Sequence, residues 1–181
     1  MRHRLAENDR RPEITLKKLF GTIPNVECYA GLINQVVMTL ISNSIDAMNE
    51  CSNEQLKKNP PSLEIITAIA DDDRIQITIR DNGTGIPDTV MAQIFDPFFT
   101  TKAVGQGTGL GLAIAHQIIT ERHGGRLTCT SQTQSPNSGT TFTIELPINQ
   151  VAHFKSTQSM PATESSKQSV SPLKAIVSAI K

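Results

Sequence analysis

The sequence has no excess of charge of either sign and no long apolar run. Its 181 residues include 17 basic and 17 acidic side chains, so its charge does not favour nucleic acid or an anionic membrane as a partner. No apolar stretch reaches the about eighteen residues that a membrane helix needs, and the charged N-terminus has no apolar signal core. We therefore predict a soluble, cytoplasmic domain without membrane contact, although a parent protein could carry membrane segments elsewhere.

The sequence is also poor in cysteine. Cys28, Cys51 and Cys129 lie far apart, are odd in number and form no CxxC pair. This pattern argues against a disulfide framework and against a cysteine-rich metal site. We expect buried or half-buried thiols in a reducing compartment.

Apolar residues recur at two different spacings. Between residues 31 and 48 they repeat at helical spacing, whereas Ile75, Ile77 and Ile79 alternate with polar residues, as in a strand buried on one face. These criteria predict helices at 31–48 and 110–120, and strands at 14–17, 62–70, 74–81, 126–131 and 140–146.

Composition divides the chain into three parts. A charged lead-in at 1–11 precedes one domain of ordinary size at 12–147. The tail, 148–181, is rich in Ser, Gln, Lys and Thr, and we predict disorder over 148–172. The last nine residues place apolar side chains on one helical face, so they form either a short docking helix or a frayed end.

Two glycine-rich motifs indicate a nucleotide site. In DNGTGI (81–86), Asp81 ends a predicted strand, where its carboxylate can accept a hydrogen bond from an exocyclic amine such as that of adenine. The alternative is an ordinary Asn-Gly turn. In GQGTGLGLAIA (105–115), glycines expose backbone N–H groups just before a helix, an arrangement that favours phosphate. The alternative there is a flexible hinge. Neither motif has the spacing or context of a P-loop or a Rossmann fingerprint.

The helix before these motifs carries a polar stripe. Thr39, Asn43, Asp46 and Glu50 share one face of it. The amide oxygen of Asn43 suits Mg²⁺, which keeps several waters and shares substrate phosphates. A solvated helix face is the alternative interpretation.

The segment between the glycine motifs, IFDPFFTTK (94–102), contains half of the six phenylalanines of the chain. Phe95, Phe98 and Phe99 form either a small satellite core or the base of a lid that closes over nucleotide. Lys102 at its end can reach a phosphate or can be a solvated loop lysine.

In this order the motifs resemble the C-terminal catalytic, ATP-binding domain of sensor histidine kinases, within the superfamily that includes Hsp90, DNA gyrase and MutL. The resemblance implies a Bergerat-type ATP-binding fold, which is an α/β two-layer sandwich with a mixed, mostly antiparallel sheet and helices on one face. It covers roughly 12–147 and rests on the N box NQVVMTLISNSIDAM (34–48), the glycine boxes at 81–87 and 105–115, the F box at 94–102, and the terminal strands HGGRL (123–127) and GTTFTIELP (139–147).

The same resemblance implies ATP and Mg²⁺ as ligands. Asp81 would hold the adenine amine with help from Thr140 through water, and Asn43 would bind the metal. Asn43 and Lys102 would be the catalytic residues, beneath a lid at roughly 95–106. The implied nucleotide contacts are Asn43, Asp46, Asp81, Gly83, Gly85, Ile86, Phe98, Lys102, Gly105, Gly107, Thr108, Gly109, Leu110, Gly111, Leu112 and Thr140.

Thr39 bears on the chemistry. The hydrolysing members of the superfamily carry a glutamate four residues before the metal-binding Asn, and histidine kinases usually carry Asn there. Thr39 departs from both patterns and is no general base. The resemblance thus implies a protein-histidine kinase. Alternatives are an ATPase, a serine kinase of the anti-sigma type, or a nucleotide-binding regulatory module or remnant without turnover.

The phosphoacceptor has no candidate in this sequence. Family kinases phosphorylate a histidine in a motif resembling HExRxPL, and none of His3, His116, His123 and His153 has that context. We expect a separate phosphoacceptor and dimerisation domain, in a parent protein or in trans, and a response-regulator receiver domain as an indirect partner. The domain itself would be a monomer.

Overall fold

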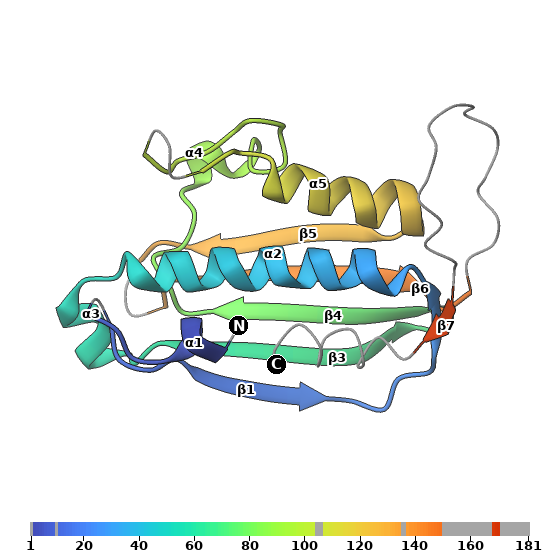
Figure 1. The fold of residues 1–181 in the computed structure, drawn as a ribbon, viewed down its shortest axis with the longest axis horizontal. Helices are drawn as coiled ribbons and strands as arrows, with labels where there is room; N and C mark the ends of the chain where they lie inside the picture. Colours follow the sequence, from blue (N-terminus) through green and yellow to red (C-terminus); the bar gives the residue numbers. More distant parts are fainter. Residues whose placement is uncertain (1, 10, 104–106, 135–136, 150–167, 171–181) are drawn as a thin grey trace.

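The computed structural model describes residues 2–9, 11–103, 107–134, 137–149 and 168–170 (Figure 1). The elements in chain order are α1 (Arg2–Leu5), β1 (Thr15–Phe20), β2 (Val26–Cys28), α2 (Ala30–Asn49), α3 (Asn53–Lys58), β3 (Ser62–Asp71), β4 (Arg74–Asp81), α4 (Asp88–Met91), α5 (Gly111–Gln117), the π-helical turn η1 (Ile118–Arg122), β5 (Arg126–Gln132), β6 (Gly139–Pro147) and β7 (Gln168–Val170).

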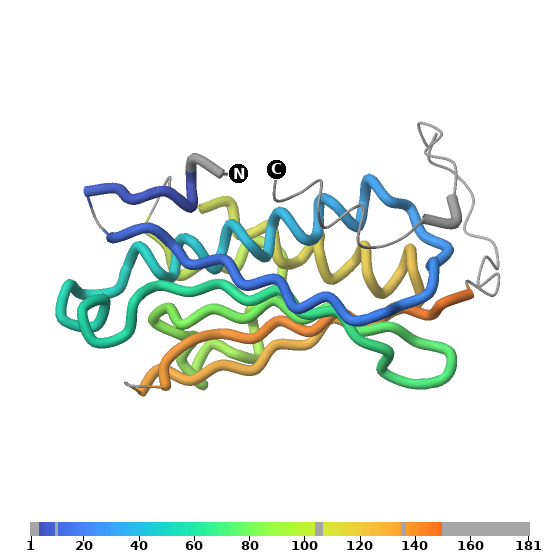
Figure 2. The backbone as a smooth tube through the Cα atoms, turned by 90° about the horizontal axis from the view of Figure 1, so that it is seen from below, coloured from blue at the N-terminus to red at the C-terminus, as the bar shows by residue number. Residues whose placement is uncertain are grey.

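The main sheet is mixed and mostly antiparallel, as predicted. Within the described residues it has five strands in the order β1-β3-β4-β6-β5, and only the β1–β3 pair is parallel. The long helix α2 and the helix α5 lie together on one side of this sheet (Figures 1 and 2). The predicted two-layer α/β sandwich is therefore confirmed.

The core lies between α2 and the inner face of the sheet. Ile75, Ile77 and Ile79 of β4 are fully buried beneath the helices, whereas the residues between them face the other side. The predicted period of two is correct because β4 is a central strand covered on one face only. From α2 the buried side chains are Ile33, Val36, Val37, Leu40, Ile41, Ser44, Ile45 and Met48.

Several short elements carry too little periodicity to be predicted. The helices α1, α3 and α4 have four to six residues, and β2 has three. Only α3 has a clear local signal, because Ser52 and Gln55 form a capping box. The predicted helix at 110–120 becomes α5 followed by η1, and the chain leaves η1 through Gly124, whose φ is 58°.

The C-terminal tail differs from the prediction in part. Prediction and structure differ at Gln168–Val170, because β7 pairs with β2 instead of being irregular. The rest of the predicted disordered segment from residue 150, and the possible helix in the last nine residues, lie outside the described residues.

All three cysteines are free, and burial raises the pKa of Cys28 to about 11. Within the described ranges, no helix has the length and apolarity to cross a membrane.

Candidate functional site

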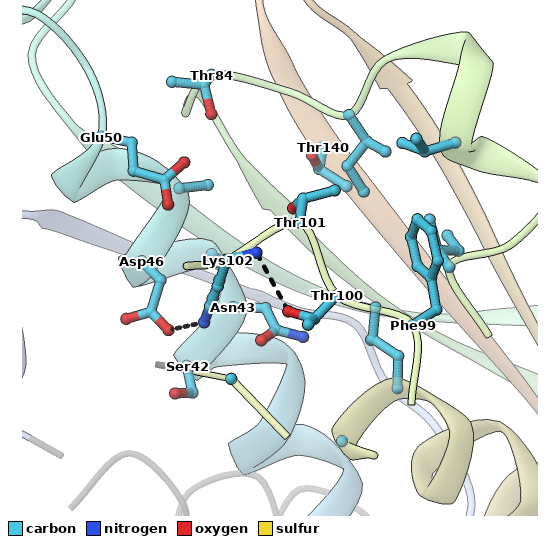
Figure 3. A pocket seen from close by; sticks show the side chains of 18 of the residues that line it. Ser42, Asn43, Asp46, Glu50, Thr84, Phe99, Thr100, Thr101, Lys102 and Thr140 are labelled. Carbon is cyan, nitrogen blue, oxygen red and sulfur yellow. Dashed lines mark hydrogen bonds and ion pairs between the residues drawn. The ribbon is translucent and has the colours of Figure 1, made fainter. Parts of the chain in front are cut away.

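A cavity of about 460 Å³ lies between α2, the loop after β4, the segment ending at Lys102, the glycine run at 107–112, and β6. Figure 3 shows polar side chains of α2 at one side of it and residues 99–102 at the other. The segments that line the cavity are the motifs that the sequence analysis singled out. They meet because α2 runs alongside β4 and its C-terminal end lies beside the loop after that strand (Figure 1).

Asp81 is the most buried acidic group of the cavity, with 4% of its surface exposed. It ends β4 opposite Thr140 of β6. Its Oδ1 atom accepts hydrogen bonds from the backbone N–H groups of Gly83, at 2.9 Å, and Thr140, at 3.3 Å. Its Oδ2 atom has no hydrogen-bond partner among the described residues. One oxygen therefore holds the loop in place while the other remains available to a ligand.

The protonation of Asp81 is set by opposing effects. Burial raises the pKa of this carboxyl above its ordinary value, while the N–H groups of Gly83 and Thr140 lower it. Ser44 of α2 also lowers this pKa, although its hydroxyl completes no hydrogen bond among the described residues. An unpaired buried oxygen is unfavourable. A hydrogen-bond donor from a ligand would therefore stabilise the charged carboxylate of Asp81 through Oδ2.

The loop after β4 packs closely on α2. A β-carbon at Gly83 would lie 2.9 Å from Cβ of Ala47 and 3.0 Å from Oδ1 of Asp81. Glycine is thus required where the backbone turns between the helix and the carboxylate. The N–H of Thr84 also bonds to the carbonyl oxygen of Ala47, at 3.4 Å. These contacts fix Asp81 relative to α2.

Asp46 and Lys102 form an ion pair that also lines the cavity. The Nζ atom of Lys102 lies 2.6 Å from Oδ2 of Asp46, and the side chains are 32% and 28% exposed, respectively. Asn43, one turn earlier on α2, lines the same part of the cavity (Figure 3). This part of the cavity therefore combines a lysine cation, a carboxylate and an amide.

The position four residues before Asn43 carries no acid or base. The methyl carbon of Thr39 faces the start of α5, where a β-carbon at Gly111 would lie 3.2 Å from it. Thr39 is not among the residues that line the cavity. A threonine packed in this way has no proton-accepting group to activate water.

Most of the residues predicted from the sequence are brought together. Those that line the cavity are Asn43, Asp46, Asp81, Gly85, Ile86, Lys102, Gly107, Thr108, Gly109, Gly111, Leu112 and Thr140. Gly83 and Leu110 lie beside the cavity without lining it, and Gly105 falls outside the described residues.

Phe98 is placed differently from the prediction. Its side chain is 74% exposed and does not line the cavity, whereas Phe99 does. Phe98 has a φ of 66°, which is rare for a residue with a side chain, and this turn directs Phe99 inward instead. Phe95 stacks on His116 of α5, with ring centroids 4.9 Å apart. The segment thus has a half-buried aromatic anchor, Phe95, and one aromatic cavity wall, Phe99.

Sequence reasoning missed the residues whose role depends on distant contacts. Ser44 faces Asp81 from α2, and Arg4 reaches Asp46 from the N-terminal segment. Ser131 of β5 accepts a hydrogen bond from the N–H of Ile86, at 2.8 Å, and so supports the loop after β4. Ser44 could have been identified from the sequence, because it interrupts the apolar face of α2. No sequence pattern marks Arg4 or Ser131 as part of the site.

Comparison with known proteins agrees with this geometry. Residues 29–150 match the family described as histidine kinase-, DNA gyrase B-, and HSP90-like ATPase. The chain belongs to this family. The prediction of a histidine-kinase-type ATP-binding domain is therefore confirmed, and the cavity is that of an ATPase fold.

The relatives are sensor kinases. This chain is 39% identical over 127 residues to sensor kinase CckA of Brucella abortus, covering 67% of this chain and 13% of that protein. It is 39% identical over 134 residues to the histidine-protein kinase AtoS of Escherichia coli K12, covering 74% of this chain and 20% of that protein. The chain thus spans a fifth or less of the length of these two relatives.

Solved structures of a histidine kinase are also similar to this chain. The catalytic domain of histidine kinase ThkA superposes with a TM-score of 0.60 at 28% identity, covering 75% of this chain and 81% of that one. A structure of ThkA in complex with the response regulator TrrA matches with a TM-score of 0.57 at 26% identity, covering 75% of this chain and 34% of that one.

Proposed function

We propose that this chain binds ATP with Mg²⁺ and transfers the γ-phosphoryl group to a histidine on a separate domain or chain. The observation that carries the proposal is the unpartnered Oδ2 atom of buried Asp81, which lines the same cavity as Lys102 and Asn43. This arrangement suits a ligand with an amine at one end and phosphates at the other.

The adenine would occupy the end formed by Asp81. Its exocyclic amine would donate to Oδ2, which has no hydrogen-bond partner among the described residues. Ile86, Ile94 and Phe142 supply apolar walls to the same cavity, and an aromatic base is favoured between such walls. Thr140 lies opposite Asp81 in the sheet and would assist through water.

The phosphates would lie between α2 and the glycine run. Lys102 supplies a positive charge, and residues 107–112 supply backbone N–H groups at the start of α5. The amide oxygen of Asn43 fits a hard cation that retains most of its waters. Mg²⁺ bound there would neutralise charge on the β- and γ-phosphates.

The reaction asks little covalent chemistry of this chain. The bond between the γ-phosphorus and its bridging oxygen breaks, the electron pair stays on ADP, and a phosphorus–nitrogen bond forms to the imidazole. The protein contributes positioning and charge neutralisation. Thr39 supports transfer over hydrolysis, because the position that carries a glutamate in the hydrolysing members of the superfamily has no carboxylate in this chain.

The partners follow from this chemistry. We expect a histidine-bearing, dimerising helical domain as the direct acceptor, in the cytoplasm where ATP is supplied. A response-regulator receiver domain would take the phosphoryl group from that histidine. ThkA in complex with TrrA is a related kinase with such a regulator.

Calorimetric titration with a non-hydrolysable ATP analogue, with and without Mg²⁺, tests binding. We expect binding that Mg²⁺ strengthens, and we expect the Asp81→Asn variant to lose it, because the open acceptor becomes an amide. Phosphotransfer is then tested by adding labelled ATP and a histidine-bearing helical hairpin. Binding without transfer would favour a regulatory module, steady phosphate release by this chain alone would favour an ATPase, and absence of binding would reject every nucleotide-based function.

A further inference from the structure

The N-terminal segment, described at residues 2–9 and 11–12, is folded around a buried arginine. Arg11 is only 3% exposed. Its Nε atom donates to Oδ1 of Asn49, at 2.7 Å, near the end of α2. Its guanidinium also donates to the backbone carbonyl oxygens of Arg4, Leu5, Ala6 and Pro12. This segment is therefore tied to itself and to α2, and the backbone of Arg4 is held in place.

Leu5 adds an apolar anchor next to Arg4. It is 8% exposed and belongs to the main core. Its carbonyl oxygen also accepts a hydrogen bond from the N–H of Ile14, at 2.8 Å. Arg4 thus projects from a fixed backbone toward the polar face of α2.

The side chain of Arg4 meets two residues that line the ATP-binding cavity. Its Nη2 atom lies 2.6 Å from Oδ1 of Asp46, and its Nη1 atom lies 2.6 Å from Oγ of Ser42. The second oxygen of Asp46 is the one that holds Lys102, also at 2.6 Å. One carboxylate therefore joins a cation from the N-terminal segment to a cation from the segment that ends at Lys102.

The charges of these three groups do not cancel. Arg4 and Lys102 carry two positive charges and Asp46 carries one negative charge, so the cluster keeps one positive charge. Without Arg4, the remaining pair would be neutral, and Asp46 would hold Lys102 with its full charge. The loss of net positive charge and the stronger hold of Asp46 on Lys102 would both disfavour the approach of an anionic phosphate.

We propose that Arg4 is a positioning residue for the nucleotide polyphosphate, which acts by occupying Asp46 and so freeing Lys102 to pair with phosphate. This inference rests on the proposed ATP binding and goes beyond it, since it assigns the N-terminal segment a part in the site. Arg4 does not itself line the cavity, so its effect passes through Asp46.

The test is a titration of the full chain with a non-hydrolysable ATP analogue, ADP and adenosine. Arg4→Met keeps the length of the side chain and removes its charge. We expect it to weaken binding of the ATP analogue about three- to tenfold, to weaken ADP less, and to leave adenosine unchanged, since one partly exposed charge acts only on the phosphates. We expect Arg4→Lys to recover much of the loss. The difference should shrink at high ionic strength.

Arg122→Met is the matched control, because Arg122 is an exposed arginine of η1. If wild type binds the ATP analogue and Arg4→Met binds it as Arg122→Met does, the role of Arg4 is rejected while the proposed function stands. Equal weakening of the ATP analogue and adenosine would also reject it, as a purely structural effect. If wild type binds no nucleotide, both proposals fail.

A double-mutant cycle keeps the test independent of folding defects. In the Asp46→Asn background, Lys102 is no longer held by a charge, so we expect the effect of Arg4→Met on the ATP analogue to fall below about twofold. An unchanged effect would show that Arg4 does not act through Asp46.

Discussion

Gly109 and Phe98 meet backbone to backbone where the glycine run passes the phenylalanine-rich segment. Both residues have a φ of 66°. A β-carbon at Gly109 would lie 2.3 Å from the carbonyl carbon of Phe98 and 2.5 Å from its oxygen. The two segments that flank the cavity thus fix each other, and only a residue without a side chain allows the contact.

Gly109→Ala should therefore destabilise the site strongly. The new methyl group must displace the backbone of Phe98, so we expect a loss of more than about 3 kcal/mol of unfolding free energy, or a local rearrangement that abolishes nucleotide binding. Urea unfolding and calorimetric titration measure the two effects.

Gly124→Ala is the control for this change. Gly124 has a similar φ of 58°, yet among the described residues no heavy atom beyond Gly124 and its two chain neighbours lies within 4 Å of its β-carbon position. It should cost only the backbone term of roughly 1–2 kcal/mol and leave nucleotide binding intact. Equal effects of the two substitutions would contradict the importance of the Phe98 contact.

The stability of the nucleotide-free protein should depend on pH through Asp81. Burial raises the pKa of this carboxyl in the folded state, so the folded protein binds more protons than the unfolded chain between the ordinary and the raised pKa. The free energy of unfolding contributed by Asp81 therefore falls as pH rises through that range and is constant above it. Urea unfolding across the acidic range should show this slope in wild type and in the exposed control Asp72→Asn, but not in Asp81→Asn. A slope retained in Asp81→Asn would assign it to another group.

Lys102→Met should impair transfer more than folding. The Lys102–Asp46 pair is partly exposed, so its loss should change the free energy of unfolding by less than about 1 kcal/mol. Phosphotransfer to a histidine-bearing hairpin should slow about a hundredfold, because a cation at the phosphates is removed. Lys18→Met, on the exposed edge strand β1, should leave the rate unchanged. A normal rate in Lys102→Met would exclude a catalytic role for this lysine.

His123 should be structural. It is 1% exposed, its Nε2 atom accepts the N–H of Tyr29 at 3.1 Å, and its Nδ1 atom lies 2.9 Å from the carbonyl oxygen of Ile118. The ring is therefore neutral with its proton on Nδ1. His123→Ala should lower the free energy of unfolding by about 2–4 kcal/mol, because it leaves buried backbone groups unpaired. His116→Ala, at a half-buried position, should cost less when urea unfolding of the two variants is compared.

The fold and most of the cavity could be predicted from local patterns. The alternation of Ile75, Ile77 and Ile79 identifies a strand with one buried face, and the polar stripe of α2 places Asn43 and Asp46 on one side of a helix. Such patterns suffice because burial on one face is a property of a segment and its period. Local patterns could not show which of Phe98 and Phe99 faces the cavity. This depends on the left-handed backbone conformation of Phe98 in a loop.

The sequence by itself determined the order of the motifs, the layers of the fold and most of the predicted residues that line the cavity. Tertiary structure alone decided which charges meet. Arg4 and Asp46 are 42 positions apart, and Lys102 lies 56 positions beyond Asp46. No local pattern encodes such contacts, because they require Arg11 and Leu5 to fold the N-terminal segment onto α2 before Arg4 can reach the carboxylate.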